Sequence, residues 1–149
     1  MSNPNRIFAI LSELRSDVAT VRDQAASEAA DYFEAGQLSE NQYRTLVHEL
    51  LKVAADESNR VAKESIFNAL SSASMSGMAQ AINWDPIANR MDELDLNCLE
   101  HALVILGFSK RAKYRKTIER FVQHSDRDIS TAATEALEEN KATLARRSV

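Results

Sequence analysis

Apolar and small side chains recur along this chain at the three- and four-residue spacing of amphipathic helices. Four stretches repeat one pattern, in which an acidic or polar residue precedes small and aliphatic residues: 17–29, 57–70, 95–106 and 128–137. Their starts lie about 30 to 40 residues apart, a period typical of stacked helical hairpins. The pattern therefore predicts an array of helical repeats rather than a single globular core.

Helix start and stop signals divide the chain into pairs of helices. Asn3-Pro4 is a cap followed by a first-turn proline, Gly36 is a stop signal, and Ser39-x-x-Gln42 is typical of a capping box. We expect one domain, residues 1–149. Its four hairpins are predicted at about residues 4–35, 39–74, 85–107 and 110–145. Residues 71–84 are predicted to form one irregular, Ser-rich insert.

Composition favours an all-α fold in a reducing compartment. The 149 residues include only 3 Gly and 2 Pro, too few for the many tight turns of an all-β fold. Cys98 is the single cysteine, so no internal disulfide is expected. The N-terminus lacks the pattern of a secretion signal, and no apolar stretch approaches the roughly 20 residues of a membrane span. These features predict a cytoplasmic protein that does not contact membranes.

The charge is unevenly distributed along the chain. Residues 1–108 carry 16 acidic and 8 basic side chains, whereas residues 109–149 carry 6 acidic and 10 basic ones, for a net charge of −4. An acidic total disfavours general nucleic-acid binding, because neutralisation of phosphates supplies most of that affinity. A basic partner for the acidic part is the simpler inference.

The repeated signatures resemble the HEAT-repeat family of α-solenoids. The resemblance is carried by Val21-Arg22 with Ala25 and Ala29, and by Arg60-Val61 with Ala69-Leu70. It implies a short right-handed α-solenoid of about four hairpins, whose acidic starts cap the second helices and whose second helices line a concave, partner-binding face. The third hairpin departs from the pattern, since it has no Val-Arg pair and a short first helix. An irregular bundle of four helix pairs is the alternative.

The predicted second helices also indicate where a partner binds. In the fourth helix, Val61, Ala62, Ser65 and Ala69 centre one face, and the other face combines charged residues with Phe67. An aromatic side chain among charges is the composition of a protein-binding hot spot. Alternatively, Phe67 packs against the 71–84 insert. The predicted partner-binding residues are Asp23, Gln24, Asp31, Arg60, Lys63, Glu64, Phe67, Asn97, Glu100, His101, Asp128, Thr131 and Glu135.

No residue pattern indicates catalysis, a metal site or a cofactor. Cys98-x-x-His101 places two potential ligands one turn apart, but zinc needs about four ligands, and Cys98 lies on an apolar stripe. Adjacent acids such as Asp92-Glu93 point to different faces of a helix, as solvated surface residues do. The basic run from Lys110 to Lys116 is interpreted as a solvated convex helix, with binding of nucleic acid or of an acidic protein as the alternatives.

These observations predict a non-enzymatic protein-binding module. In length, acidity and helical character the chain is similar to small bacterial toxin-neutralising immunity proteins. That similarity implies a protein that covers the basic, substrate-binding cleft of a nuclease-type toxin. The alternatives are a nucleic-acid-binding or base-repair HEAT-like protein and a general adaptor or scaffold.

Overall fold

The computed structural model describes the backbone of residues 3–147 and the side chains of residues 3–141. Every regular element within the described backbone is a helix, which confirms the predicted all-α fold class. The chain divides into two compact units, Met1–Ile82 and Asn83–Val149. None of the helices in the described part of the chain is long and apolar enough to cross a membrane. The handedness of the array and its organisation as a single domain stay predictions.

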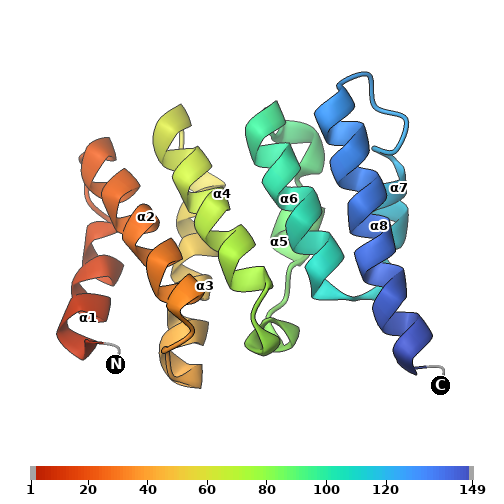
Figure 1. The fold of residues 1–149 in the computed structure, drawn as a ribbon. Coiled ribbons are helices and arrows are strands. Elements are labelled where there is room, and N and C mark those ends of the chain that lie inside the picture. Colours follow the sequence, from red (N-terminus) through yellow and green to blue (C-terminus); the bar gives the residue numbers. More distant parts are fainter. Residues whose placement is uncertain (1–2, 148–149) are drawn as a thin grey trace. The chain divides into compact units, whose positions relative to one another are not determined.

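The first unit consists of two helical hairpins followed by a 3₁₀ helix. Its elements are α1 (Pro4–Glu13), α2 (Ala19–Ala35), α3 (Glu40–Asp56), α4 (Arg60–Ser74) and η1 (Gly77–Ala81). Helices α2 and α4 pack side by side (Figure 1), and α1 packs against both α2 and α3. The second helices of the two hairpins thus form one layer of this unit and the first helices the other. Residues 71–82, most of the predicted insert, hold the end of α4 and η1.

Local capping signals set several helix ends as the sequence predicts. The side chain of Asn3 caps α1, which begins with Pro4. Gly36 ends α2 in the left-handed conformation, with φ of 67°, which costs glycine little because it has no Cβ. Ser39 and Gln42 form the complete capping box at the start of α3.

Only some of the acidic residues expected at the starts of the second helices cap those helices. Asp95 caps its helix as predicted. Helix α4 is instead capped by Asn59, because the carboxylate of Glu57 is held by Arg22. The last helix begins at Arg127, and it is Asp126, ahead of the expected residues, that accepts hydrogen bonds from the first backbone N–H groups.

Alanine allows the close packing of α2 against α4. The buried alanines of these helices are Ala25, Ala26, Ala29 and Ala30 on α2, and Ala62, Ala69 and Ala73 on α4. Larger side chains from α3, such as Leu46 and Leu50, fill the core between the two layers. The hydroxyl of Tyr43 donates to the carbonyl oxygen of Ala73 at 2.6 Å, so the polar end of this buried side chain is satisfied. Burial raises the pKa of Tyr43 above its ordinary value.

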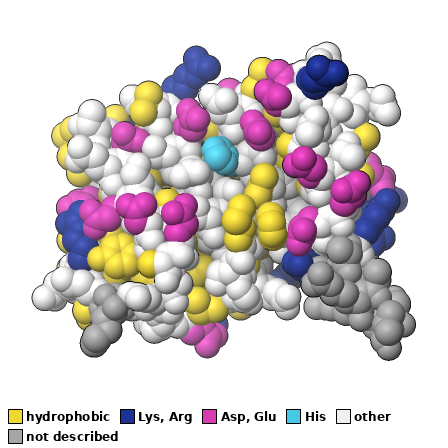
Figure 2. All heavy atoms as spheres, in the orientation of Figure 1, with side chains coloured by type: hydrophobic (Ala, Val, Ile, Leu, Met, Phe, Trp, Pro, Cys, Tyr) yellow, Lys and Arg dark blue, Asp and Glu magenta, His cyan; other side chains and the backbone are white. Residues whose placement is uncertain are grey.

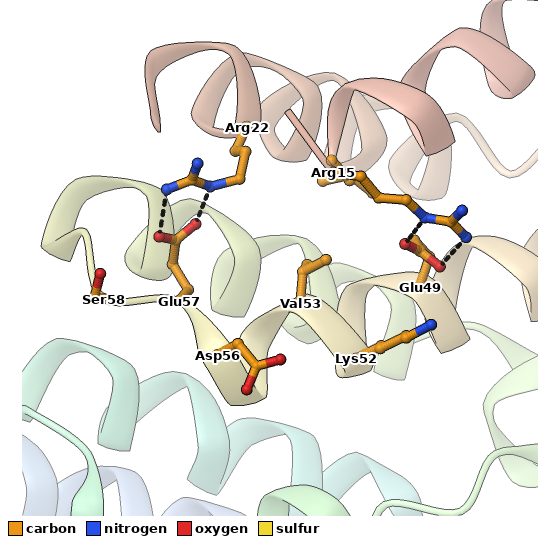
Figure 3. Close-up of a pocket in the computed structure, with 9 residues that line it drawn as sticks. Arg15, Arg22, Glu49, Lys52, Val53, Asp56, Glu57 and Ser58 are labelled. Carbon is orange, nitrogen blue, oxygen red and sulfur yellow. Dashed lines mark hydrogen bonds and ion pairs between the residues drawn. The ribbon is translucent and has the colours of Figure 1, made fainter. Parts of the chain in front are cut away.

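Two arginine–glutamate pairs join the first hairpin to the second (Figure 3). Arg15 donates to Glu49 through Nε and Nη2 at 2.5 and 2.9 Å. Arg22 donates to Glu57 in the same two-bond geometry at 2.7 and 2.8 Å, and its Nη1 donates to the backbone oxygen of Ser16. The Glu57 side chain is only 2% exposed, so its charge depends on Arg22. The hydrogen bonds from Arg22 hold the pKa of Glu57 below its usual 4.5, against the opposing effect of burial.

The second unit contains two hairpins whose first helices are short. Its elements are α5 (Asp85–Ala88), η2 (Met91–Glu93), α6 (Leu96–Ser109), η3 (Ala112–Tyr114), α7 (Arg115–Glu119) and α8 (Arg127–Arg147). The first half of the predicted 110–145 hairpin is therefore divided into η3, α7 and the turns that follow them. Its apolar residues Tyr114, Ile118 and Phe121 are nevertheless buried, so this segment faces the core through an irregular backbone.

Helices α6 and α8 approach closely at Gly107. A Cβ built on this glycine would lie 2.9 Å from the Cα and 3.0 Å from the Cβ of Ala136. Farther along α8, the fully buried Asn140 donates to the carbonyl oxygen of Arg111 at 3.1 Å. This bond fastens α8 to the turn after α6, where Lys110 has a positive φ of 59°.

Gly107→Ala is expected to lower the free energy of unfolding by about 1–3 kcal/mol, because the added methyl group must push the α8 backbone away. Chemical denaturation monitored by circular dichroism measures the change. Gly77→Ala is the matched control, since a Cβ there meets no atom within 4 Å, and its effect should stay within about 0.5 kcal/mol. Equal stabilities for the two variants would contradict the close approach of α6 and α8.

Glu57→Gln should lower the free energy of unfolding at pH 7 by about 1–3 kcal/mol, because it replaces a hydrogen-bonded buried carboxylate with a neutral amide. It should also make the protein less sensitive to acid. The folded-state pKa of Glu57 is depressed, so its contribution is present above the unfolded-state pKa near 4.5 and is lost as the pH falls through the folded-state value.

Urea unfolding between about pH 7 and pH 3 measures both effects. Glu40→Gln is the control, because Glu40 pairs with Arg44 on the exposed surface and should change neither quantity appreciably. If Glu57→Gln lost stability in acid as steeply as the parent, the proposed role of this pair would be wrong.

Candidate protein-binding surface

The predicted partner-binding residues of the first unit lie on the outer side of α2 and α4, apart from Phe67. Gln24, Asp31, Arg60 and Glu64 are exposed, and Asp23 and Lys63 are half-buried. The side chain of Asp23 accepts a hydrogen bond from the Ser65 hydroxyl, which joins the two helices across this surface. We call this surface, with Glu34, Val61 and Asn68 added, the α2–α4 face.

Phe67 does not belong to that surface. Its side chain is only 3% exposed, whereas Val61, which the sequence places on the face opposite the charged residues, is 63% exposed. The prediction that Phe67 is an exposed binding residue is therefore wrong. The reason is that α4 is buried over most of its circumference, including Ile66, Phe67 and Leu70, and only a narrow stripe that includes Val61, Glu64 and Asn68 reaches solvent.

The remaining predicted residues lie on α6 and α8 of the second unit. Asn97, Glu100, Asp128, Thr131 and Glu135 are exposed, and His101 is half-buried. Helices α6 and α8 pack directly against each other, so these residues share one surface. We call it, with Glu138 added, the α6–α8 face.

Both faces are predominantly acidic. Figure 2 shows acidic side chains over α2 and α4 in the first unit and over α6 and α8 in the second, with basic side chains near the edges of each. Their exposed acidic residues are Asp31, Glu34 and Glu64 on the α2–α4 face, and Glu100, Asp128, Glu135 and Glu138 on the α6–α8 face. Within the described side chains, none of these carboxylates takes part in an ion pair.

The structure adds residues that the sequence analysis did not select. Glu34 and Glu138 extend the acidic surfaces, and Val61 provides an exposed apolar side chain on α4. Helical spacing was a usable signal for the two acids, since each lies three residues after a selected residue, Asp31 or Glu135. No comparable signal pointed to Val61, because its exposure depends on how the hairpins pack.

The basic run from Lys110 to Lys116 is tied to its own unit. Lys110 pairs with Glu139 at 3.0 Å and Lys113 pairs with Asp85 at 2.9 Å. The hydroxyl of Tyr114, a residue that is 3% exposed, donates a hydrogen bond to the carboxylate of Asp85 at 2.7 Å. The bonds from Tyr114 and Lys113 hold the pKa of Asp85 below its ordinary value. Two cations of this segment, Lys110 and Lys113, therefore neutralise carboxylates of the protein itself.

The described residues contain no group of three or more His, Cys, Asp or Glu side chains arranged to hold a metal ion. Cys98 is fully buried on α6, where it packs as a small apolar side chain. Asp92, one of the adjacent acids considered as a catalytic pair, forms an exposed ion pair with Arg120.

Comparison with known proteins bears on the fold alone. No protein-family model matches the sequence, and no curated protein matches it either. Among solved structures, the chain is similar to the crystal structure of an engineered protein from the Northeast Structural Genomics Consortium, with a TM-score of 0.74 and 14% sequence identity. The match covers 91% of this chain and 62% of that one. At this identity it supports a shared helical architecture and says nothing about activity.

Phe67→Ala is expected to act on stability rather than on recognition. Removing a buried aromatic ring should lower the free energy of unfolding by about 3–5 kcal/mol, with a corresponding fall in Tm. Asn68→Ala is the control at the neighbouring, exposed position, and its effect should stay within about 0.5 kcal/mol. Thermal and urea denaturation of both variants measure the Tm and the free energy of unfolding. A Phe67→Ala variant as stable as the parent would show that Phe67 is a surface residue.

Proposed function

We propose that this protein is a non-enzymatic, protein-binding module that uses its acidic helical faces to bind a basic partner. The observation that carries the proposal is a difference between the acidic faces and the basic run in how their charged side chains are paired. The exposed carboxylates of the α2–α4 and α6–α8 faces make no ion pairs within the described side chains, so their charge is directed to solvent. Lys110 and Lys113 of the basic run are already paired with carboxylates of the protein.

The mechanism is electrostatic steering followed by occlusion. A surface on which acidic side chains outnumber basic ones attracts a basic partner and raises the association rate, and it disfavours acidic partners. A partner whose own function depends on a basic cleft, such as a nuclease, loses access to its substrate when that cleft is covered. The most specific form of the proposal is therefore a cytoplasmic immunity protein that neutralises a nuclease-type toxin.

The paired helical hairpins and their alanine-rich contacts also support the proposal that the chain is built from HEAT-type repeats. In such repeats small residues allow the second helices to approach closely and present their outer surfaces as a platform for other proteins. The packing of α2 against α4, and of α6 against α8, has this character.

Affinity purification of the tagged protein from its source organism tests the proposal directly. The expected result is a basic protein that co-elutes near stoichiometry, whose nuclease activity falls when this protein is added. Salt-dependent binding of the purified protein to duplex DNA, without such a partner, would contradict it and favour a nucleic-acid-binding protein instead.

Charge reversal on the acidic faces should weaken partner binding. Asp31→Lys with Glu64→Lys in the first unit, or Glu100→Lys with Glu135→Lys in the second, is expected to slow association by about tenfold at low salt. Lys116→Glu, an exposed position in the basic run, is the matched control and should leave the rate unchanged or slightly higher. Surface plasmon resonance with the captured partner measures these rates after each variant has been shown to melt like the parent. Loss of binding in Lys116→Glu alone would assign the interface to the basic segment.

A further inference from the structure

The first unit contains a cleft that the proposed function does not use. Its volume is about 420 Å³, within the range of small-molecule sites. Its lining residues are Leu14, Arg15, Arg22, Glu49, Lys52, Val53, Asp56, Glu57 and Ser58. Figure 3 shows the Arg22–Glu57 pair at one side, the Arg15–Glu49 pair at the other, and Val53 between them.

The α3 side of the cleft is a mixed stripe in which two charges are not used by the fold. Glu49, Lys52, Val53 and Asp56 recur at helical spacing along α3, and of these Glu49 is held by Arg15. Here Lys52 and Asp56 are exposed, and neither forms an ion pair within the described side chains, although each is one helical turn from the other. Their charges are therefore available to a ligand.

The charges of the cleft balance, which restricts the ligand class. The lining contributes three cations, Arg15, Arg22 and Lys52, and three carboxylates. A polyanion such as a nucleotide gains little from a lining without net charge, whereas a dipolar molecule gains from both signs. Lys52 and Asp56 are also one helical turn apart on α3, with about 6 Å between the Cβ atoms of such neighbours.

The end of the cleft at Arg15 is suited to a carboxylate. Arg15 uses Nε and Nη2 to hold Glu49, which leaves Nη1 able to donate to a further acceptor. Lys52 lies near the same pair, and its positive charge helps to lower the pKa of Glu49. Arg15 is 65% exposed, so a ligand can reach it. Asp56 and Ser58 supply acceptor oxygens for an ammonium group at the cleft.

We propose that this cleft binds a small zwitterion carrying a carboxylate and an ammonium group, as a free amino acid or a short peptide does. The carboxylate lies against Nη1 of Arg15 and the ammonium of Lys52, and the ligand ammonium lies against Asp56. Val53 contacts the aliphatic part of the ligand. The site is separate from the α2–α4 face, so it does not depend on the proposed function.

Titration of the ¹⁵N-labelled full chain by NMR tests the proposal. L-Leucine and L-alanyl-L-alanine are the two probes. Tighter binding of L-leucine would indicate that the ligand is a free amino acid, and tighter binding of the dipeptide would indicate a short peptide. Shifts of the amide signals of residues 49–58 are expected at ligand concentrations of about 1–10 mM or below. N-Acetyl-L-leucine and L-leucinamide, each lacking one of the two charges, should bind about tenfold more weakly than L-leucine.

Lys52→Gln and Asp56→Asn should each weaken binding of the zwitterionic probe by about tenfold, because each removes one of the two charges that recognise it. Both positions are exposed and make no ion pair within the described side chains, so the variants should fold normally. Asp31→Asn, on the α2–α4 face, is the control and should leave probe binding unchanged while it weakens binding of a basic partner. The proposal is overturned if neither probe shifts the signals of residues 49–58 at about 10 mM, or if the singly charged analogues bind as well as the zwitterions.

Discussion

Close contact between small residues of neighbouring second helices is the constraint on which the rest of each unit depends. Alanines bring α2 against α4 in the first unit, and Gly107 meets Ala136 where α6 crosses α8 in the second. Because protein interiors are packed to nearly crystalline density, one added methyl group at such a contact displaces backbone rather than filling space. Each second helix keeps a stripe that reaches solvent, and this stripe carries the exposed polar residues of the two faces.

Charged residues divide into those used by folding and those left to solvent. Arg15 and Arg22 reach 34 and 35 residues along the chain to Glu49 and Glu57, a separation close to the sequence period, so these pairs connect successive hairpins. Lys110 and Lys113 are likewise neutralised within the second unit. The exposed carboxylates of the two second-helix faces have no such partners within the described side chains. This division, rather than the net charge, is what supports the proposal of a basic protein partner.

The first unit thus carries two surfaces for which we propose different kinds of ligand. The α2–α4 face is exposed and carries more acidic than basic side chains, and we propose that it binds a basic protein, chiefly through the rate of encounter. The cleft beside the two arginine–glutamate pairs offers both signs of charge in a hollow of about 420 Å³, which suits a small dipolar molecule. The first depends on exposed positions of α2 and α4, and the second on one stripe of α3 together with Arg15.

The sequence by itself determined the fold class, the pairing of helices and several helix ends. Spacing of small and aliphatic residues, the left-handed stop at Gly36 and the capping box at Ser39 are local properties, and they act within a few residues of the chain. It also placed twelve of the thirteen predicted binding residues at exposed or half-buried positions. Only the tertiary structure decided that Phe67 is buried and Val61 exposed, and only it paired Arg22 with Glu57 and formed the cleft. The physical reason is that a helical pattern assumes one buried side, whereas the buried arc of α4 and the partner of each charge depend on segments brought together from elsewhere in the chain.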